Sequence, residues 1–389
     1  MGILSNTVSI CQYQVVGEFP AGDLFEFASN GLSKQAFRSI ESTLDELSCG
    51  WANLDDHQRS EFSTPAGFWR DQYLAFTLRR DQRKIPASLL KAYCRVAEEE
   101  YLAEHPGLHR VPKQKREEIK EAVRLRLLAR TLPIPATYDL AWNTKEQTIL
   151  FSSLSQGVTD LFEEEFKKTF PGLRLILVHP MARADRLVPE ELKHQLEQSN
   201  RATSPAVLDQ IRSNQWLGQD FLLWLLYRSM TGAGEYRVNQ PGVAGSGDTF
   251  SAYLDDRLVL VSATEEGAQK MTVAGPQGGF GEVHTALQNG KKITEATIHL
   301  EFEENSWKVT LKAERFYFAS FRCPSVQIEK DNTADRASEQ EAVFYERMHL
   351  LETGLQLFDS LFAEFIENRL GSGWAKAEAD IQAWLTRSE

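Results

Sequence analysis

The sequence is poor in cysteine and has no long hydrophobic run. Its four cysteines in 389 residues lie far apart and form no C-x-x-C pair: Cys11, Cys49, Cys94 and Cys323. This spacing argues against a zinc site and a secreted disulfide scaffold, and it favours a reducing compartment. The longest apolar run, residues 221–227, is far shorter than the roughly 20 residues that a membrane helix needs. No signal segment stands at the N-terminus. We therefore expect a soluble, cytoplasmic protein with no membrane partner.

Sequence motifs of common enzyme classes are also missing. The chain contains no G-x-x-x-x-G-K-[ST], no H-E-x-x-H and no G-x-S-x-G, and its eight histidines are scattered. The glycine-rich stretch 275–281 lacks the lysine and the strand–loop–helix context of a phosphate loop, so we interpret it as a turn. The sequence therefore predicts no cofactor, no metal and no catalytic residues, and it favours a non-enzymatic protein. One alternative stays open: Glu301 and Glu303 face one side of an expected strand and could hold Mg²⁺.

The chain does carry a strong segregation of charge. Residues 79–130 contain 14 Lys/Arg and eight Asp/Glu, a net charge of +6, whereas the whole chain has a net charge of −12. The remainder therefore carries −18. Such a separation is physically useful when one surface meets a polyanion and the rest of the protein does not.

Two helices are expected within this basic segment, and together they form a finger over residues 86–131. The first begins at Pro86, which suits the first helical position, and is broken at His105-Pro-Gly107. The second runs from about residue 113 to residue 130 and ends before Pro133-Ile-Pro135. Four of its cations fall within roughly an 80° sector of the helix: Lys113, Arg116, Lys120 and Arg124. Such a stripe suits contacts with phosphates. The alternative is a solvated helix whose cations pair with nearby carboxylates.

The overall pattern predicts an α+β fold with mixed or antiparallel sheets, a protruding two-helix basic arm and a long C-terminal amphipathic helix. Residues 33–47 have helical spacing, and strands are expected at 137–142 and 147–152 as a hairpin. We place two regions, at 1–200 and 201–389. The long helix covers 338–369 and has a heptad seam of Phe344, Met348, Leu351, Leu355, Phe358, Phe362 and Phe365. This seam either packs on its own sheet or meets another helix in an oligomer.

Several segments resemble one known family. Gly50-Trp51 is followed by Arg79-Arg-Asp-Gln-Arg-Lys-Ile-Pro86, then by Leu90-Lys91 and by Leu127-Leu-Ala-Arg130. Trp142 lies in the hairpin after the finger, and a basic-aromatic segment, 315–318, ends a later strand. In this order the segments resemble the RdgC family, bacterial DNA-binding proteins associated with recombination.

The resemblance implies a ring-shaped, head-to-head homodimer that encircles double-stranded DNA without strong sequence preference. It also implies restraint of a RecA-type recombinase and association with the nucleoid, and single-stranded DNA is a further possible ligand. By residue match and helical spacing together, the expected DNA-binding residues are Arg79, Arg83, Lys91, Lys113, Lys115, Arg116, Lys120, Arg124 and Arg130. The chain departs from the family where Leu132 replaces a frequent aromatic residue and Ala129 replaces a proline.

The leading hypothesis is therefore a sequence-nonspecific DNA-binding dimer that modulates homologous recombination. A Mg²⁺-dependent exonuclease is one alternative, and some members of the family carry that label. A protein-binding module that uses its basic arm to meet an acidic partner is another.

Overall fold

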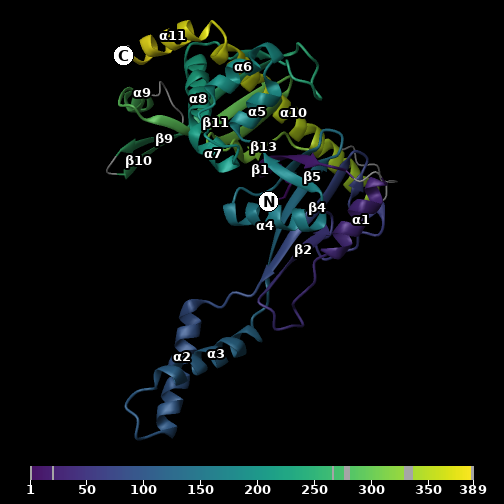
Figure 1. The fold of residues 1–389 in the computed structure, drawn as a ribbon, viewed down its shortest axis with the longest axis vertical. Helices are drawn as coiled ribbons and strands as arrows, with labels where there is room; N and C mark the ends of the chain where they lie inside the picture. The colour runs from purple at the N-terminus through teal and green to yellow at the C-terminus, as the bar shows by residue number, and fades with distance from the viewer. Residues whose placement is uncertain (1, 20–21, 265–266, 276–280, 328–335, 387–389) are drawn as a thin grey trace. The chain divides into compact units, whose positions relative to one another are not determined.

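The structure is a computed structural model that describes residues 2–19, 22–264, 267–275, 281–327 and 336–386. It mixes helices with antiparallel sheet, which confirms the expected α+β class (Figure 1). The chain divides into two compact units. Unit 1 comprises Met1–Gly17, Ala141–Leu161 and Leu173–Glu389, and unit 2 comprises Glu18–Leu140 and Phe162–Gly172. The boundary expected at residue 200 falls inside the last segment of unit 1.

Unit 2 is built around an antiparallel pair, β2 (Leu47–Asn53) and β4 (Tyr73–Gln82), in which Trp51 lies opposite Leu78. Strand β5 (Ile134–Asn143) follows β4 in the sheet order, and the short β3 (Trp69–Arg70) also pairs with β4. Helix α1 (Leu24–Lys34) and the second half of α4 (Gln156–Thr169) belong to this unit, as does the 3₁₀ turn η1 (Pro65–Gly67). The fully buried Trp51 indole donates a 2.6 Å hydrogen bond to Thr169 Oγ1, which fixes α4 in the core.

The helix expected at 33–47 is wrong. Helix α1 ends at Lys34, and the chain then runs as an irregular segment until β2 begins at Leu47. Trp51 takes part in two backbone hydrogen bonds with this segment, Phe37 N to Trp51 O at 2.8 Å and Trp51 N to Gln35 O at 2.9 Å. Tertiary hydrogen bonds thus replace the helical ones, even though the apolar spacing fits a helix. The side chain of Leu44, which that spacing would bury, is 65% exposed.

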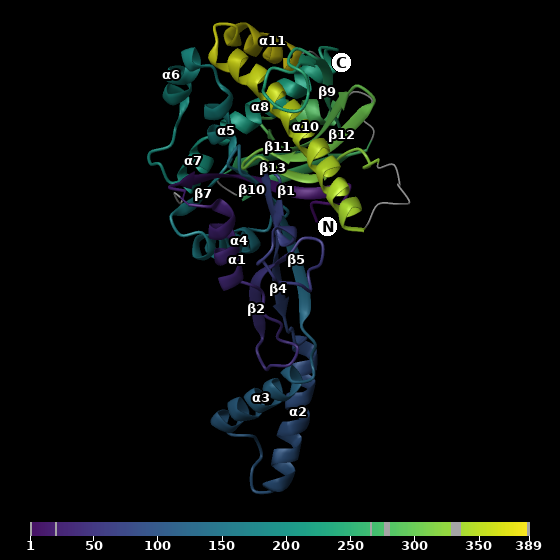
Figure 2. The same ribbon diagram turned by 90° about the vertical axis from the view of Figure 1, so that its right-hand side faces the viewer.

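Helices α2 (Ala87–Glu104) and α3 (Lys113–Leu128) lie between β4 and β5 in the chain and pack on each other. In both views the two helices lie beyond the ends of β4 and β5 (Figures 1 and 2). Helix α2 has no buried residue over its 18 residues, although it carries an apolar stripe, and Leu89 and Tyr93 of that stripe are each 39% exposed. Helix α3 buries only its last apolar positions, Val123, Leu127 and Leu128.

Unit 1 contains an antiparallel sheet in the order β10 (Gly267–Ala274), β9 (Thr249–Thr264), β11 (Lys292–Phe302), β12 (Asn305–Lys312), β13 (Tyr317–Arg322), β1 (Thr7–Gly17) and β6 (Thr148–Phe151). Strand β8 (Glu235–Arg237) pairs with β9, and β7 (Leu173–Leu177) pairs with β1. The last residues of β5 follow β6 in this order, so the expected hairpin is confirmed. Strand β1 is shared by partners from distant parts of the chain, since it pairs with β6, β7 and β13.

The helices of unit 1 are α5 (Pro180–Leu187), α6 (Glu190–Ser199), α7 (Val207–Ser213), α8 (Gln215–Met230), α9 (Gly281–Gln288), α10 (Arg336–Leu370) and α11 (Trp374–Thr386). All seven residues of the heptad seam on α10 are buried within this chain. Phe358 and Phe362 of the seam each meet the rings of Phe221 of α8 and Phe316 edge-on, with ring centroids 4.8–5.8 Å apart. The seam therefore forms the core of unit 1.

Candidate nucleic-acid interface

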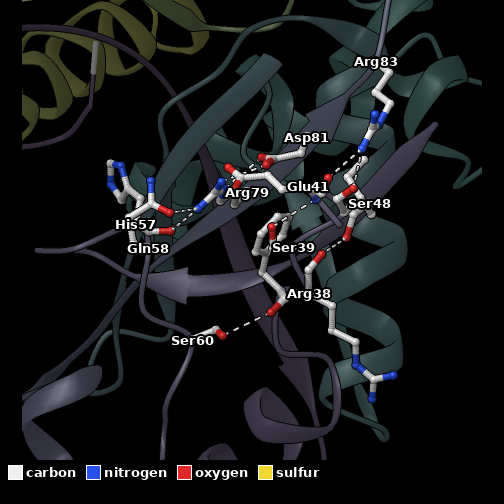
Figure 3. A network of polar contacts seen from close by, with 12 residues as sticks. Arg38, Ser39, Glu41, Ser48, His57, Gln58, Ser60, Arg79, Asp81 and Arg83 are labelled. Atoms are coloured by element: carbon white, nitrogen blue, oxygen red, sulfur yellow. Dashed lines mark hydrogen bonds and ion pairs between the residues drawn. The ribbon is translucent and has the colours of Figure 1, made fainter. Parts of the chain in front are cut away.

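Arg79 is buried in unit 2, with only 4% of its surface exposed. Its guanidinium group donates two parallel hydrogen bonds to Asp81, from Nε to Oδ1 at 2.8 Å and from Nη2 to Oδ2 at 2.7 Å (Figure 3). The remaining nitrogen, Nη1, donates to His57 O at 2.8 Å and to Gln58 Oε1 at 3.1 Å. Its carbon Cζ lies 4.3 Å from the centre of the Phe37 ring. All three guanidinium nitrogens are thus occupied inside the protein.

Arg83 is also internal, and it is 6% exposed. Nη1 donates to Leu128 O at 2.9 Å and Thr131 O at 2.8 Å, at the C-terminal end of α3. Nη2 donates to three carbonyls of the irregular segment before β2: Ile40 O at 2.6 Å, Glu41 O at 3.2 Å and Thr43 O at 2.9 Å. Since both terminal nitrogens donate to carbonyls of the same unit, we assign Arg79 and Arg83 structural roles. We leave them out of the contact surface, although the sequence places them there.

Four other expected DNA-binding residues lie on α3 and form ion pairs with glutamates: Lys115, Arg116, Lys120 and Arg124. Lys115 Nζ lies 2.9 Å from Glu118, Lys120 lies 4.0 Å from Glu117, and Arg124 lies 3.3 Å from Glu121, each pair one turn apart. The hydrogen bond from Lys115 to Glu118 raises the pKa of that lysine. These three cations are 38–57% exposed, and ion pairs open to solvent in this way contribute about 0–1 kcal/mol each. A DNA phosphate can therefore take the place of the glutamate as the partner of each cation, at a small cost in free energy.

Two ion pairs connect α3 to other segments. Arg116 Nε lies 3.4 Å from Glu98 of α2, so this pair links the two helices. Arg124 also contacts Glu46, which precedes β2. Arg124 thus contributes both to the cationic surface and to the attachment of α3.

The remaining three expected residues, Lys91, Lys113 and Arg130, are exposed and form no ion pair with any carboxylate in the described part of the chain. Lys84 and Arg110 share this condition, although sequence reasoning counted them only as part of the basic segment. These five residues are exposed, whereas Arg79 and Arg83 are buried. The number of charges in a sequence does not reveal this difference. We call Lys84, Lys91, Arg110, Lys113 and Arg130 the open cations.

The segment that contains α2 and α3 keeps a net positive charge when the buried Arg79 and Arg83 are left out of the count. Residues 84–130 contain 11 Lys/Arg and seven Asp/Glu, a net charge of +4. Arg126 adds an exposed cation whose Cζ lies 5.6 Å from the centre of the Tyr93 ring, so a planar aromatic group supports its guanidinium. A cationic, solvent-exposed surface of this kind can bind a polyanion through its phosphates without reading a sequence.

Comparison with protein families identifies one part of the chain. Residues 10–200 match the model described as "Putative exonuclease, RdgC". This part of the chain belongs to the RdgC family. The match contains all of unit 2 from Glu18 to Gly172, and therefore both helices of the cationic pair. A search of curated proteins found no match.

The carboxylates that sequence reasoning offered for Mg²⁺ do not come together as a ligand group. Glu301 Oε1 accepts a 2.8 Å hydrogen bond from Tyr253, whereas Glu303 lines a separate cavity of about 190 Å³ beside Asp248 and His349. Among the described residues, no group of three or more His, Cys, Asp or Glu side chains could hold a metal ion. Likewise, none of the described helices is long and apolar enough to cross a membrane.

Proposed function

We propose that this member of the RdgC family binds DNA without sequence specificity through the exposed cations on and beside α2 and α3. The observation that carries the proposal is the set of open cations on and beside α2 and α3, in a segment (residues 84–130) with a net charge of +4, within a chain whose net charge is −12. The proposed contact residues are Lys91, Lys113, Lys115, Arg116, Lys120, Arg124 and Arg130, together with Lys84, Arg110 and Arg126.

The physical basis is the release of counterions. Duplex DNA carries condensed cations, and each phosphate that a lysine or arginine neutralises releases part of that layer into solution. The gain is entropic and independent of base sequence. Because these cations lie on the solvent-facing surface of α2, α3 and the segments beside them, they can follow a phosphate backbone without entering a groove.

The family assignment supports a finer form of the proposal. Two copies of the chain would form a ring around duplex DNA, with the helical pairs at its closing contact, and the bound ring would limit the growth of a RecA-type recombinase filament. In this arrangement topology lengthens residence on DNA, while the cations supply the affinity. Light scattering at micromolar concentration tests the dimer, and a monomer there would contradict the ring.

The decisive experiment is the affinity for a fluorescent 30-base-pair duplex across a salt series in EDTA. A dimer that contacts about six phosphates should give a log–log slope of about −5, and thus a loss of about 10³-fold between 50 and 200 mM salt. No binding at 50 mM salt would reject the proposal.

The same titration separates the alternatives. An exonuclease would shorten end-labelled DNA when Mg²⁺ is supplied and would stop in EDTA. A protein-binding module would show no DNA binding at low salt and would form a stable complex with an acidic protein partner.

A further inference from the structure

We propose that Arg83 is a positioning residue for DNA binding: it contacts no DNA and instead fixes the direction in which α2 and α3 leave unit 2. This inference rests on the proposed function, because it concerns how the same cationic surface is presented. It also gives a role to a residue that the resemblance to the RdgC family had placed among the DNA-binding residues.

The first observation is where Arg83 lies in the chain. It follows Gln82, the last residue of β4, and its backbone N donates to Glu46 O at 2.9 Å, so the backbone of Arg83 is still held by the sheet. Only the short segment Lys84-Ile-Pro86 then separates Arg83 from the start of α2. Arg83 thus lies directly after β4, where the chain leaves the sheet for the helical pair.

The second observation is what its guanidinium group joins. The carbonyl of Leu128 lies at the end of α3 and that of Thr131 just after it, while those of Ile40, Glu41 and Thr43 belong to the irregular segment before β2. One side chain therefore connects the outgoing end of β4, the returning end of α3 and a third segment of unit 2. A cation at this place also interacts favourably with the negative end of the α3 dipole.

Few other contacts could perform this task. Helix α2 has no buried residue, so it brings no apolar anchor to the rest of unit 2. Helix α3 buries three apolar side chains near its C-terminus, and Arg124 adds a contact to Glu46 at the same end. The direction of the pair therefore depends on its base, where the guanidinium group of Arg83 is the most highly coordinated cation described.

Loss of this connection should let the helical pair sample many directions. If the binding-competent direction were then populated one tenth of the time, the apparent affinity for DNA would fall about tenfold. The number of phosphates contacted in the complex would not change. A positioning residue and a phosphate-contacting residue therefore differ in a measurable way, because only loss of the latter makes the salt slope shallower, by about 0.9 per contact.

The experiment compares Arg83→Gln with Lys113→Gln, an open cation, in the full-length chain over the same salt series. We expect Arg83→Gln to lower affinity about tenfold at every salt concentration with an unchanged slope. Lys113→Gln should lower affinity with a slope shallower by about 0.9 for each chain in the complex. Trypsin should cut Arg83→Gln faster after Lys84 and Arg130, the basic residues that flank the helical pair. A shallower slope for Arg83→Gln, or an affinity equal to that of the wild type, would overturn the inference.

Two further measurements keep the test decisive. Arg83→Lys retains the charge but reaches fewer carbonyls, so it should fall between wild type and Arg83→Gln in affinity and in trypsin resistance. If both variants lose the cooperative thermal transition, Arg83 governs the stability of unit 2 and the positioning role is rejected. If the wild type itself does not bind DNA, the proposed function fails, and the trypsin comparison alone decides whether Arg83 fixes the helical pair.

Discussion

Arg79 and Asp81, two residues apart on strand β4, hold each other through two nearly equal hydrogen bonds of 2.8 and 2.7 Å, and both side chains are buried. The pair stands at the start of the basic segment, yet its net charge is zero and none of it reaches solvent. Breaking a buried pair of this kind leaves an uncompensated charge.

We expect Asp81→Asn to lower the free energy of unfolding by about 3–5 kcal/mol, because the guanidinium group of Arg79 would stay buried without its carboxylate. Urea denaturation measures the change. Arg59→Gln, which removes an exposed ion pair with Asp56, is the control and should cost less than about 1 kcal/mol. An equal loss of unfolding free energy in the two variants would mean that the buried ion pair stabilises the fold no more than an exposed one.

The open cations give a second prediction. Replacing Lys91, Lys113 and Arg130 by glutamine should make the salt slope of DNA binding shallower by about 0.9 for each phosphate contact that is lost. Unfolding should be unaffected, because the described part of the chain offers these residues no ion-pair partner. The matched control replaces three exposed cations of unit 1, Lys145, Arg174 and Lys376. A slope that changes equally in both triple variants would move the contact surface away from α2 and α3.

The glutamates beside the cations should weaken binding. Glu98→Gln removes the partner of Arg116 and one negative charge from the helical pair. We expect DNA affinity at low salt to rise about twofold, which corresponds to about 0.5 kcal/mol, and the gain to vanish as salt screens the charge. Glu146→Gln, at an exposed position of unit 1, should leave affinity unchanged. Weaker DNA binding by Glu98→Gln would show that the ion pair joining α2 to α3 favours binding more than the negative charge of Glu98 opposes it.

His179 provides a prediction on pH. Burial lowers the pKa of its imidazole from 6.5 to about 4, and its Nδ1 is buried without a hydrogen-bond partner. The folded state thus disfavours the protonated ring, and the unfolded state binds the proton first. The stabilisation is complete above pH 6.5 and is lost as the pH falls from 6.5 to about 4, by about 3 kcal/mol in total. His179→Gln should remove this part of the acid sensitivity in denaturation at pH 7 and pH 4.5. The exposed His105→Gln should keep it.

Gly50 gives a prediction on packing. A Cβ atom at this position would lie 2.7 Å from both N and Cα of Phe37, and 2.8 Å from Gln35 O. Gly50→Ala would therefore push apart β2 and the segment that crosses it, at a cost of about 1–3 kcal/mol or more. Gly157→Ala in α4 has open space around its Cβ and should be neutral or stabilising by roughly 0.5–1 kcal/mol. Thermal denaturation of the two variants tests the contrast.

The sequence predicted the helical pair well because its signals are local. Pro86 directly precedes α2, the His105-Pro-Gly107 break directly follows it, and Pro133 and Pro135 lie a few residues after α3. Three of the ion pairs on α3 are also local, with partners three residues apart.

The fate of Arg79 and Arg83 was not predictable in this way. Gln58 lies 21 residues from Arg79, and the carbonyls that bind Arg83 lie 40–48 residues away in sequence. No periodicity connects such partners. The same distant contacts explain the wrong helix at 33–47, since the carbonyls of Ile40, Glu41 and Thr43 accept from Arg83 where a helix would have used them internally.

The pairing of β1 has a consequence for the order of folding during synthesis. Thr7 lies opposite Arg322 on β13, so the N-terminal strand cannot complete its sheet until more than 300 further residues have been made. Strands β6 and β7 are available to β1 much earlier, and unit 2 is complete once residue 172 has emerged. The ribosome extends chains at about 5–20 residues per second. Unit 2, which contains the cationic helices, can therefore fold while the edge of β1 that pairs with β13 is still unpaired.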